Sequence, residues 1–408
     1  MRKLKETQSL TTDGNEAVLQ MERPIRIGLL VERQRAYGRR ICEGAASAAV
    51  KLGSVSLGML EWTDLQQPSR LVDYDAFIVR ILDDAMAAAL RRTGKPVVDI
   101  FRNAEYPDFH SVDLDHEAIA HLAFRHFDER GFTSFAYCGY EGVRFSDIRR
   151  NAFVAAAAAR GRTVEVFMPT PSVTRRFADT VVKSELYEPI PADAKRLTRW
   201  LMTLPPATGI FCSHDLRAHH ALRCCARAGL AVPGAVALIG CDDDAVICSF
   251  ATPTITSIDP DGHETGRKAV SLAVEAVARP HLPPRHELVP PKRLIPRGST
   301  EVCVYKPDWL SEALMYIRRH AVEGIGAADV FAAVGRSHTA VARAFRETLG
   351  SSVQEQIAKV RLEHAKVLLE STDMKVAEVA LRSGFSSTSY FCGAFFAAFG
   401  QTPSNCRR

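Results

Sequence analysis

A disulfide framework and metal-ligand spacings are missing from this 408-residue chain, although it contains ten cysteines, of which Cys224 and Cys225 are adjacent. None of them forms a C-x-x-C motif, and none stands at a cysteine–histidine spacing that would bind zinc. Several lie inside apolar runs, among them Cys138, Cys212 and Cys241. This placement is typical of reduced thiols in a protein core, so we expect no disulfide framework and no bound metal.

Long hydrophobic runs are also absent. Residues 1–23 are charged and polar, and they lack the apolar stretch of about 7–15 residues that a signal peptide requires. No window approaches about 18 uninterrupted apolar residues, the length of a membrane-spanning helix. We therefore expect a flexible tail over 1–23, no membrane partner and a cytoplasmic location.

The motifs of the common enzyme classes are lacking as well. There is no G-x-G-x-x-G after the first predicted strand, no P-loop and no nucleophile elbow. Ser213, His214 and Asp215 are consecutive, and strand side chains alternate between faces, so these three cannot form a catalytic triad among themselves. His214, His219 and His220 do not make a convincing metal-binding face. We predict a protein that is not an enzyme and needs no cofactor.

Short apolar runs alternate with helical stretches over residues 24–297. The runs extend from 25–31 to 235–240, and the helices between them include 115–131 and 216–230. Such alternation predicts βαβ units and parallel sheets. Because about 270 residues exceed a typical single domain, we expect an α/β module of two similar lobes.

The pattern of predicted elements changes after a Pro/Gly/Ser-containing linker at 298–307. Strand-like runs disappear, and amphipathic helices follow one another over 308–408. This predicts an all-α domain behind the α/β module. The formal net charge of +5 permits nucleic-acid binding by such a domain but does not argue for it.

The predicted all-α domain contains two similar units, at about 327–348 and 375–399. Each combines a short helix, a glycine at the turn (Gly335 or Gly384), a serine that can cap, and a second helix. A long helix over 353–370 lies between the units and spans roughly 25–27 Å. It could hold two DNA-recognition helices about one turn of DNA, near 34 Å, apart. A single such unit could be a plain helical hairpin, but two copies bridged by one helix favour helix-turn-helix DNA binding.

The second helix of each unit has an apolar face and an outward face. The apolar faces consist of residues that recur every four positions: Val341, Phe345 and Leu349, and Phe391, Phe395 and Phe399. The outward faces supply the candidate DNA contacts, which are His338, Thr339, Ala342, Arg343, Arg346, Ser387, Thr388, Ser389 and Cys392.

The closing pattern GFSSTSYFCGAFFAAFGQTPSNCR resembles the long signature of the AraC-type DNA-binding domain, and the resemblance covers residues 308–407. It implies double-stranded operator DNA as a partner. Members of that family carry basic residues where Gly393 and Phe396 stand, and a tyrosine where Cys406 stands. Fewer cations mean fewer phosphate contacts, so we expect the second unit to bind DNA more weakly than the first.

Residues 25–297 resemble the LacI-type ligand-binding module, which shares its fold with periplasmic sugar-binding proteins. The quoted likeness lies in VDLDHEAIAHLAFRHFDERGFTSFAYCG (112–139), RRNAF (149–153) and IGCDDDAVICSFATPTITSID (239–259). His116 replaces the usual asparagine, and Ala152 replaces the usual glycine. The resemblance implies a sugar effector bound in a cleft between the lobes.

Strand ends of such lobes converge on a cleft, where carboxylates and arginines can hold sugar hydroxyls. By motif position we expect the ligand to be bound by Arg149, Asp215 and Asp242, with Asp99, Asp115, Tyr37 and Arg39 as further candidates. The alternatives are that Asp115 and Asp215 cap helices and that Arg149 makes a surface ion pair.

A LacI-type module in front of an AraC-type domain is the arrangement of the xylose operon regulatory proteins, and 36–45 and 199–211 resemble that family in particular. This resemblance implies D-xylose as effector, a homodimer, activation of transcription and contact with RNA polymerase. A different pentose or hexose, or repression, stays open. A periplasmic transport receptor is a rival interpretation, but it needs a signal peptide and leaves the helical domain unexplained.

Overall fold

The computed structural model describes residues 23–101, 106–169 and 191–407, so the predicted tail lies almost wholly outside the described residues. The chain forms two compact units. The first comprises the residues up to Arg33, Gly38–Asp113 and Gly262–Val289; the second comprises Gln34–Tyr37, Leu114–Asp261 and the chain from Pro290 onward. Each unit contains one six-stranded sheet with parallel strands. The prediction of two parallel-sheet α/β lobes followed by helices is confirmed.

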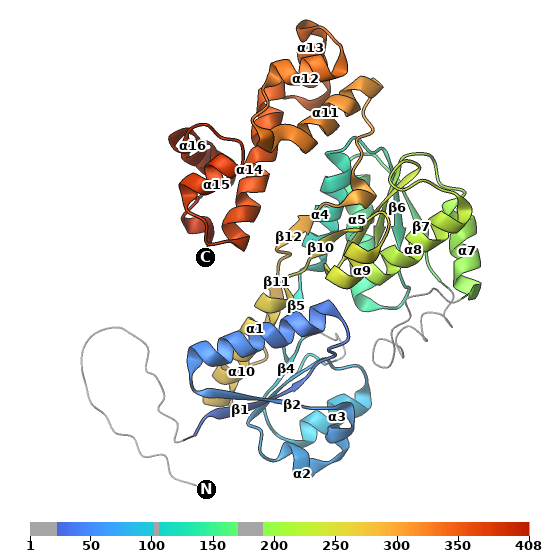
Figure 1. Cartoon of the computed structure of the whole chain (residues 1–408). Helices are drawn as coiled ribbons and strands as arrows, with labels where there is room; N and C mark the ends of the chain where they lie inside the picture. Colours follow the sequence, from blue (N-terminus) through green and yellow to red (C-terminus); the bar gives the residue numbers. More distant parts are fainter. Residues whose placement is uncertain (1–22, 102–105, 170–190, 408) are drawn as a thin grey trace. The chain divides into compact units, whose positions relative to one another are not determined.

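The first sheet has the strand order β11-β5-β4-β3-β1-β2, and β1 to β5 pair in parallel (Figure 1). Its strands are β1 (Ile25–Leu30), β2 (Val55–Met59), β3 (Ala76–Val79), β4 (Val97–Asp99), β5 (His110–Leu114) and β11 (His286–Val289). Its helices are α1 (Ala36–Leu52), α2 (Pro68–Leu71), α3 (Asp84–Arg92) and α10 (Gly262–Ala278), with the 3-10 turn η1 (Trp62–Gln66). Helices α1 and α10 lie on one face of this sheet, and α2 and α3 lie on the other (Figure 1).

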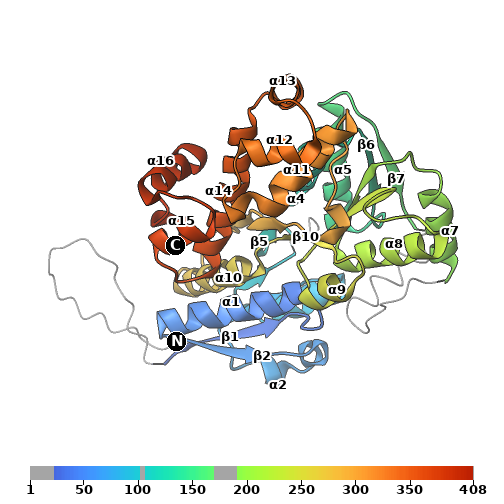
Figure 2. The ribbon, with the colours of Figure 1, turned by 45° about the horizontal axis from the view of Figure 1, so that its top comes forward.

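Two glycines let α1 and α10 approach each other closely. A Cβ atom on Gly44 would lie 1.9 Å from the carbonyl oxygen of His263, and one on Gly266 would lie 2.0 Å from that of Ile41. The two helices run side by side on their sheet (Figure 2). Any larger residue at either glycine would force the backbones apart.

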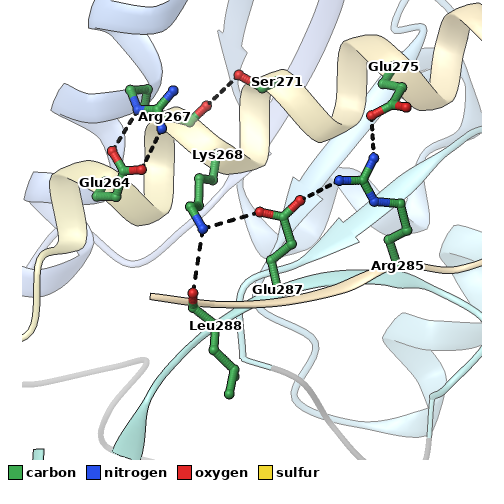
Figure 3. Close-up of polar contacts among 8 residues, drawn as sticks. All are labelled: Glu264, Arg267, Lys268, Ser271, Glu275, Arg285, Glu287 and Leu288. Carbon is green, nitrogen blue, oxygen red and sulfur yellow. Dashed lines mark hydrogen bonds and ion pairs between the residues drawn. The ribbon is translucent and has the colours of Figure 1, made fainter. Parts of the chain in front are cut away.

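Ion pairs attach the return strand β11 to α10. Lys268 on the helix pairs with Glu287 at 3.3 Å, and Arg285 pairs with Glu275 at 2.5 Å and with Glu287 at 2.8 Å (Figure 3). Exposed pairs of this kind each contribute little to stability, but the shared partners fix the position of β11 along the helix.

The second sheet has the order β12-β10-β9-β8-β6-β7; the strands from β7 to β10 are parallel, and β12 is antiparallel to β10. Its strands are β6 (Ser134–Cys138), β7 (Val164–Phe167), β8 (Thr208–Cys212), β9 (Val236–Cys241), β10 (Thr256–Asp259) and β12 (Arg293–Ile295). Its helices are α4 (His116–Asp128), α5 (Arg144–Ala158), α7 (Pro191–Leu201), α8 (Asp215–Ala228) and α9 (Ala245–Phe250).

Alternating residues of this sheet build two cores. Ala136 and Cys138 of β6 pack into a cluster with residues of α7 and α8. Phe135 and Tyr137 point the other way, where Phe135 packs against Phe124 of α4 at 5.0 Å between ring centroids. This period of two is what a strand buried on both faces requires. Cys138, like Cys212 and Cys241, is fully buried, as predicted for core thiols.

The segment predicted as a linker packs against the second sheet. The Ser299 hydroxyl, in the 3-10 turn η2 (Gly298–Thr300), donates to the Leu238 carbonyl at 2.6 Å and accepts from the Thr256 amide at 2.9 Å. The amide of Val304 donates to the carbonyl of Arg130 at 2.8 Å. Ser299 within the predicted linker therefore satisfies buried backbone groups of the second sheet.

The helical region follows from Asp308. It comprises α11 (Asp308–His320), α12 (Ala327–Val334), α13 (His338–Leu349), α14 (Val353–Ser371), α15 (Val376–Arg382) and α16 (Thr388–Phe399), with the 3-10 turns η3 (Ala321–Glu323) and η4 (Asn405–Arg407). Helix α14 joins two helix groups (Figure 1). It contributes Val353 and Ile357 to the core of the first group, and Leu362, Ala365 and Leu369 to that of the second. No helix in the described part of the chain is long and apolar enough to cross a membrane.

Candidate ligand site and nucleic-acid interface

The carboxyl ends of β6, β8 and β9 in the second unit carry the polar groups of the candidate ligand site. Arg149 reaches this edge from α5 and donates through Nη1 to the carbonyl of Ser213, which directly follows β8. Its side chain is buried, so the alternative of a surface ion pair does not hold. Arg149 Nε and Ser213 Oγ are buried and have no hydrogen-bond partner within the described residues. Buried polar atoms of this kind are rare in proteins, and a hydroxylated ligand would satisfy them.

Asp242, the first residue after β9, has a strained backbone. Its φ of 114° and the φ of 46° at Asp243 lie in a region that non-glycine residues seldom adopt. Two hydrogen bonds stabilise this backbone conformation. The Asp242 amide donates to the Ile258 carbonyl at 2.9 Å, and the Asp243 amide donates to Ser257 Oγ at 3.0 Å. Such strain clusters at ligand sites. Burial raises the pKa of Asp242 to about 7, against the opposing effect of the Arg149 charge.

The carboxylate of Asp215, after β8, forms hydrogen bonds with residues of β10 and of the segment that follows β9. It accepts from the Ser257 hydroxyl and, at 2.8 Å, from the Asp244 amide. The cap of α8 is His214, whose ring nitrogen Nδ1 accepts from the amide of Arg217 at 2.9 Å. The capping alternative for Asp215 is therefore wrong. Burial raises the pKa of Asp215 to about 6.

Asp115 and Tyr37 are two further candidate ligand-binding residues in the second unit, and they lie in different surroundings. Asp115 caps α4 by accepting from the amide of Ala118 at 2.8 Å, so its capping alternative is the one that holds. Tyr37 is half-buried and belongs to the short segment Gln34–Tyr37 that packs with the second unit. The Ala36 amide of that segment donates to the Asp244 carboxylate at 3.2 Å.

Asp99 and Arg39 belong to the first unit. Asp99 ends β4 and is buried, and its carboxylate accepts from the amides of Ile81 at 3.3 Å and Phe101 at 3.0 Å. Arg39 is exposed and donates to the carbonyl of Arg33 at 3.1 Å. The contacts of Asp99 stabilise the turn that follows its strand.

Aromatic rings at the candidate ligand site were missed in the sequence. Phe145 lies 6.1 Å from the ring of His214 and 6.3 Å from that of His116, and the Arg149 guanidinium stands 5.2 Å from the Phe145 centroid. Burial lowers the pKa of His214 well below its ordinary value. Phe145 precedes Arg149 by four residues and shares its helix face, and that spacing could have revealed it. Aromatic walls with a few polar groups are typical of small-molecule sites.

The two predicted recognition helices correspond in length, cap and burial pattern at an offset of 50 positions. Ser337 caps α13 by accepting from the amide of Ala340 at 3.3 Å, and Ser387 caps α16 by accepting from that of Tyr390 at 3.3 Å. Ser387 rather than Ser386 is therefore the second cap. The buried residues of α13 and α16 fall at matching positions, and the apolar faces are those predicted: Val341, Phe345 and Leu349 in α13, and Phe391, Phe395 and Phe399 in α16.

The candidate DNA contacts lie on the outward faces. His338, Thr339, Arg343, Arg346, Ser387, Thr388 and Ser389 are exposed, and Ala342 and Cys392 are half-buried. The side chains of Arg343 and Arg346 are 75% and 65% exposed, with only long ion pairs to Glu347 at 4.0 Å and Glu355 at 3.9 Å. Pairs this exposed hold a cation weakly, so both guanidinium groups are available to a phosphate or a base. No group of three metal-ligating side chains occurs among the described residues.

Comparison with known proteins covers both parts of the chain. Residues 124–300 match a periplasmic binding protein-like domain, and residues 330–408 match a helix-turn-helix domain. The xylose operon regulatory protein of Escherichia coli is 29% identical over 394 residues, which cover 94% of this chain and 96% of that protein. Its namesake from Haemophilus influenzae is 24% identical over 398 residues, 95% of this chain and 99% of that protein.

Solved structures agree with this comparison. The structure of a xylose-binding transcription activator covers 95% of this chain and 98% of its own, with 28% identity and a TM-score of 0.59. A LacI family transcriptional regulator from Enterococcus faecium with bound ribose covers 67% of this chain and 98% of its own, with 20% identity and a TM-score of 0.53, and supports the fold alone. The chain is therefore a transcription regulator, not an enzyme, built like the xylose operon regulatory proteins from a periplasmic binding protein-like module and a helix-turn-helix domain.

Proposed function

We propose that the chain binds a sugar, D-xylose, at the carboxyl edge of the second sheet and operator DNA through α13 and α16. In this proposal it acts in the cytoplasm as a homodimer that activates transcription through RNA polymerase. The observation that carries the sugar site is the buried Arg149 beside Ser213, with polar atoms that lack a partner in the described part of the chain. The DNA site is supported by the paired, capped recognition helices.

The chemistry of the edge suits a polyhydroxylated ligand. A sugar hydroxyl both donates and accepts hydrogen bonds, so it can donate one to the Asp242 carboxylate while accepting one from Arg149. The Phe145 ring offers an apolar surface for the C–H face of a sugar ring. The assignment to D-xylose is supported by the likeness to xylose operon regulatory proteins along nearly the whole chain.

Sugar binding can change DNA binding only if the sugar binds the DNA-competent and the DNA-incompetent states with different affinities. Two recognition helices per chain, and two chains in a dimer, would occupy paired half-sites whose spacing mirrors the symmetry of the protein. The sign of the response then depends on which state contacts the polymerase. Activation is proposed here because the similar solved structure is that of a transcription activator.

Calorimetric titration of the full chain with D-xylose, D-ribose, L-arabinose and D-glucose tests the sugar site. Asp242→Ala should remove sugar binding and leave DNA binding intact, whereas Arg343→Ala should do the reverse. Asp115→Ala is the matched control, because that carboxylate caps a helix. Preference for another sugar would overturn the xylose assignment, and equal loss of both activities in both variants would overturn the division of labour.

Transcription from the target promoter, measured with and without D-xylose, tests the sign of regulation. We expect more transcript when sugar is present. Release of the protein from DNA by sugar, with derepression of the promoter, would identify a repressor instead.

A further inference from the structure

The two recognition helices present different chemistry to the same kind of partner. At the offset of 50, Arg343 corresponds to Gly393, and Arg346 corresponds to Phe396. Both arginines are exposed, and so are Gly393 and Phe396, the latter to 55%. Helix α16 contains no lysine or arginine from Thr388 to Phe399. Its outward face therefore offers hydroxyl, thiol and aromatic groups in place of cations.

We propose that α16 reads thymine methyl groups in the major groove through apolar contacts, while α13 holds its half-site through arginines. This proposal rests on the proposed DNA-binding function. The C5-methyl of thymine is the one apolar group that a base pair presents in the major groove, and threonine methyls and phenylalanine rings are suited to contact it. Thr388, Cys392 and Phe396 recur every four residues along α16, so they lie on one side of the helix.

The dimensions of α16 fit a short run of base pairs. Eight residues separate Thr388 from Phe396, which at 1.5 Å per residue is about 12 Å. DNA rises about 3.4 Å per base pair, so these side chains span three to four base pairs. A Cβ atom at Gly393 would meet nothing within 4 Å, and a residue without a side chain there lets the helix backbone approach the groove closely.

DNA is favoured as the occupant of this face by the equivalence of α16 with α13. The serine caps, the buried positions and the left-handed glycines that end the helices, Gly350 and Gly400, all correspond. A surface kept only for a protein partner would not need this correspondence along the whole recognition helix. The exposed Phe396 is then the group that loses water when the helix enters the groove.

The test uses the full chain and a 40-base-pair duplex selected by that chain from a random pool. Deoxyuridine replaces thymidine in one half-site at a time, which removes the methyl group and keeps the base-pairing pattern. Fluorescence anisotropy should show a loss of about fourfold in affinity for each contacted methyl, and the total loss should be larger in the half-site bound by α16 than in the one bound by α13. Phe396→Ser should weaken binding to the thymidine duplex and reduce the effect of uracil.

Two matched variants separate methyl contacts from phosphate contacts. The slope of log affinity against log salt is negative. Arg346→Ser, at the corresponding position of α13, should reduce the magnitude of this slope by about 0.9 and keep the uracil effect. Gly393→Arg, which the open space at that position accommodates, should increase the magnitude by a similar amount. Circular dichroism confirms that each variant is folded; all three positions are exposed.

Three outcomes would overturn the proposal. Equal affinity for thymidine and uracil duplexes shows that no methyl is read. A uracil effect that persists unchanged in Phe396→Ser assigns the methyl contacts to other residues. Loss of promoter activation by Phe396→Ser with unchanged DNA affinity assigns the face to a protein partner. If the chain selects no duplex from the pool, the proposed DNA-binding function is itself wrong. This result is distinguishable from the three above, in which the chain binds DNA.

Discussion

The pKa of Asp242 predicts how sugar binding depends on pH. Burial raises this pKa to about 7, so the carboxyl group changes its charge within the range in which the protein can be studied. If the carboxylate is the form that accepts from sugar hydroxyls, only the ionised fraction of the protein binds. With a pKa of about 7, that fraction is about one tenth at pH 6 and about nine tenths at pH 8.

The apparent dissociation constant equals the intrinsic one divided by the competent fraction. Affinity for D-xylose should therefore rise about tenfold from pH 6 to pH 8. At pH 6 most molecules must lose a proton in order to bind, so binding should release about 0.9 proton per site. Isothermal titration in two buffers of different ionisation enthalpy measures both quantities at once.

Asp242→Asn is the control for this prediction, because the amide keeps one acceptor oxygen but does not titrate. Its affinity should be weaker than that of the parent protein at pH 8 and constant across the range. A parent protein whose affinity changes less than twofold between pH 6 and pH 8, with no proton release, would refute the reasoning. Tighter binding at pH 6 would mean that the protonated carboxyl donates to the sugar.

Four further predictions concern stability. Asp115→Ala should cost about 1 kcal/mol of unfolding free energy, because the cap of α4 is lost, and leave D-xylose affinity unchanged. Gly393→Ala should add about 1 kcal/mol, because a helical glycine gains a methyl group in open space. Asp193→Ala should cost about 3–5 kcal/mol, because it leaves the fully buried Arg217 without its ion-pair partner at 2.6 Å. Finally, the stability that the sugar-free parent protein has in excess of Asp215→Asn should fall as pH rises from about 4 through 6; the comparison with the variant is needed because the lowered pKa of the buried His214 has the opposite effect on stability in this range. An unfolded aspartate ionises near pH 4, while folded Asp215 holds its proton to about 6.

Urea unfolding followed by circular dichroism measures all four effects. A drop in sugar affinity in Asp115→Ala would give that carboxylate a ligand role in addition to the cap. Destabilisation by Gly393→Ala would show that α16 needs its glycine. For the buried ion pair, the double variant Asp193→Leu/Arg217→Met should recover much of the loss, since it removes both charges together. A stability difference between the parent protein and Asp215→Asn that is constant between pH 4 and pH 6 would contradict the raised pKa of Asp215.

Patterns among neighbouring residues were sufficient to predict much of the architecture. Apolar runs of strand length between helices are sufficient to predict parallel sheets, because the period of burial is a property of neighbouring residues. The same holds for the helix-turn-helix units. Ser337 and Phe345 lie eight positions apart in one element, and their capping and core roles follow from helix geometry alone.

The chemistry of the ligand site depended on contacts between residues far apart in the chain. Asp215 and Ser257 are 42 positions apart; Asp215 follows β8 and Ser257 lies on β10, and they meet because both strands flank β9 in one sheet. No local pattern distinguishes this carboxylate from that of Asp115. Asp115 lies directly before α4 and Asp215 is the first residue of α8, and both follow a strand, yet only Asp115 caps its helix. The burial of Arg149 likewise arises from the packing of α5 against strand ends, and the raised pKa of Asp242 arises from the burial of that carboxyl group in the folded protein.

The sequence by itself determined two α/β lobes, a helical domain and two unequal recognition helices, since helix and strand periods and the offset of 50 are properties of the chain. The tertiary structure decided which polar residues are structural and which carry atoms without a partner in the described chain, as at Arg149 and Ser213. The physical reason is that hydrogen-bond satisfaction and desolvation depend on neighbours in space, and only the folded sheet brings those neighbours together.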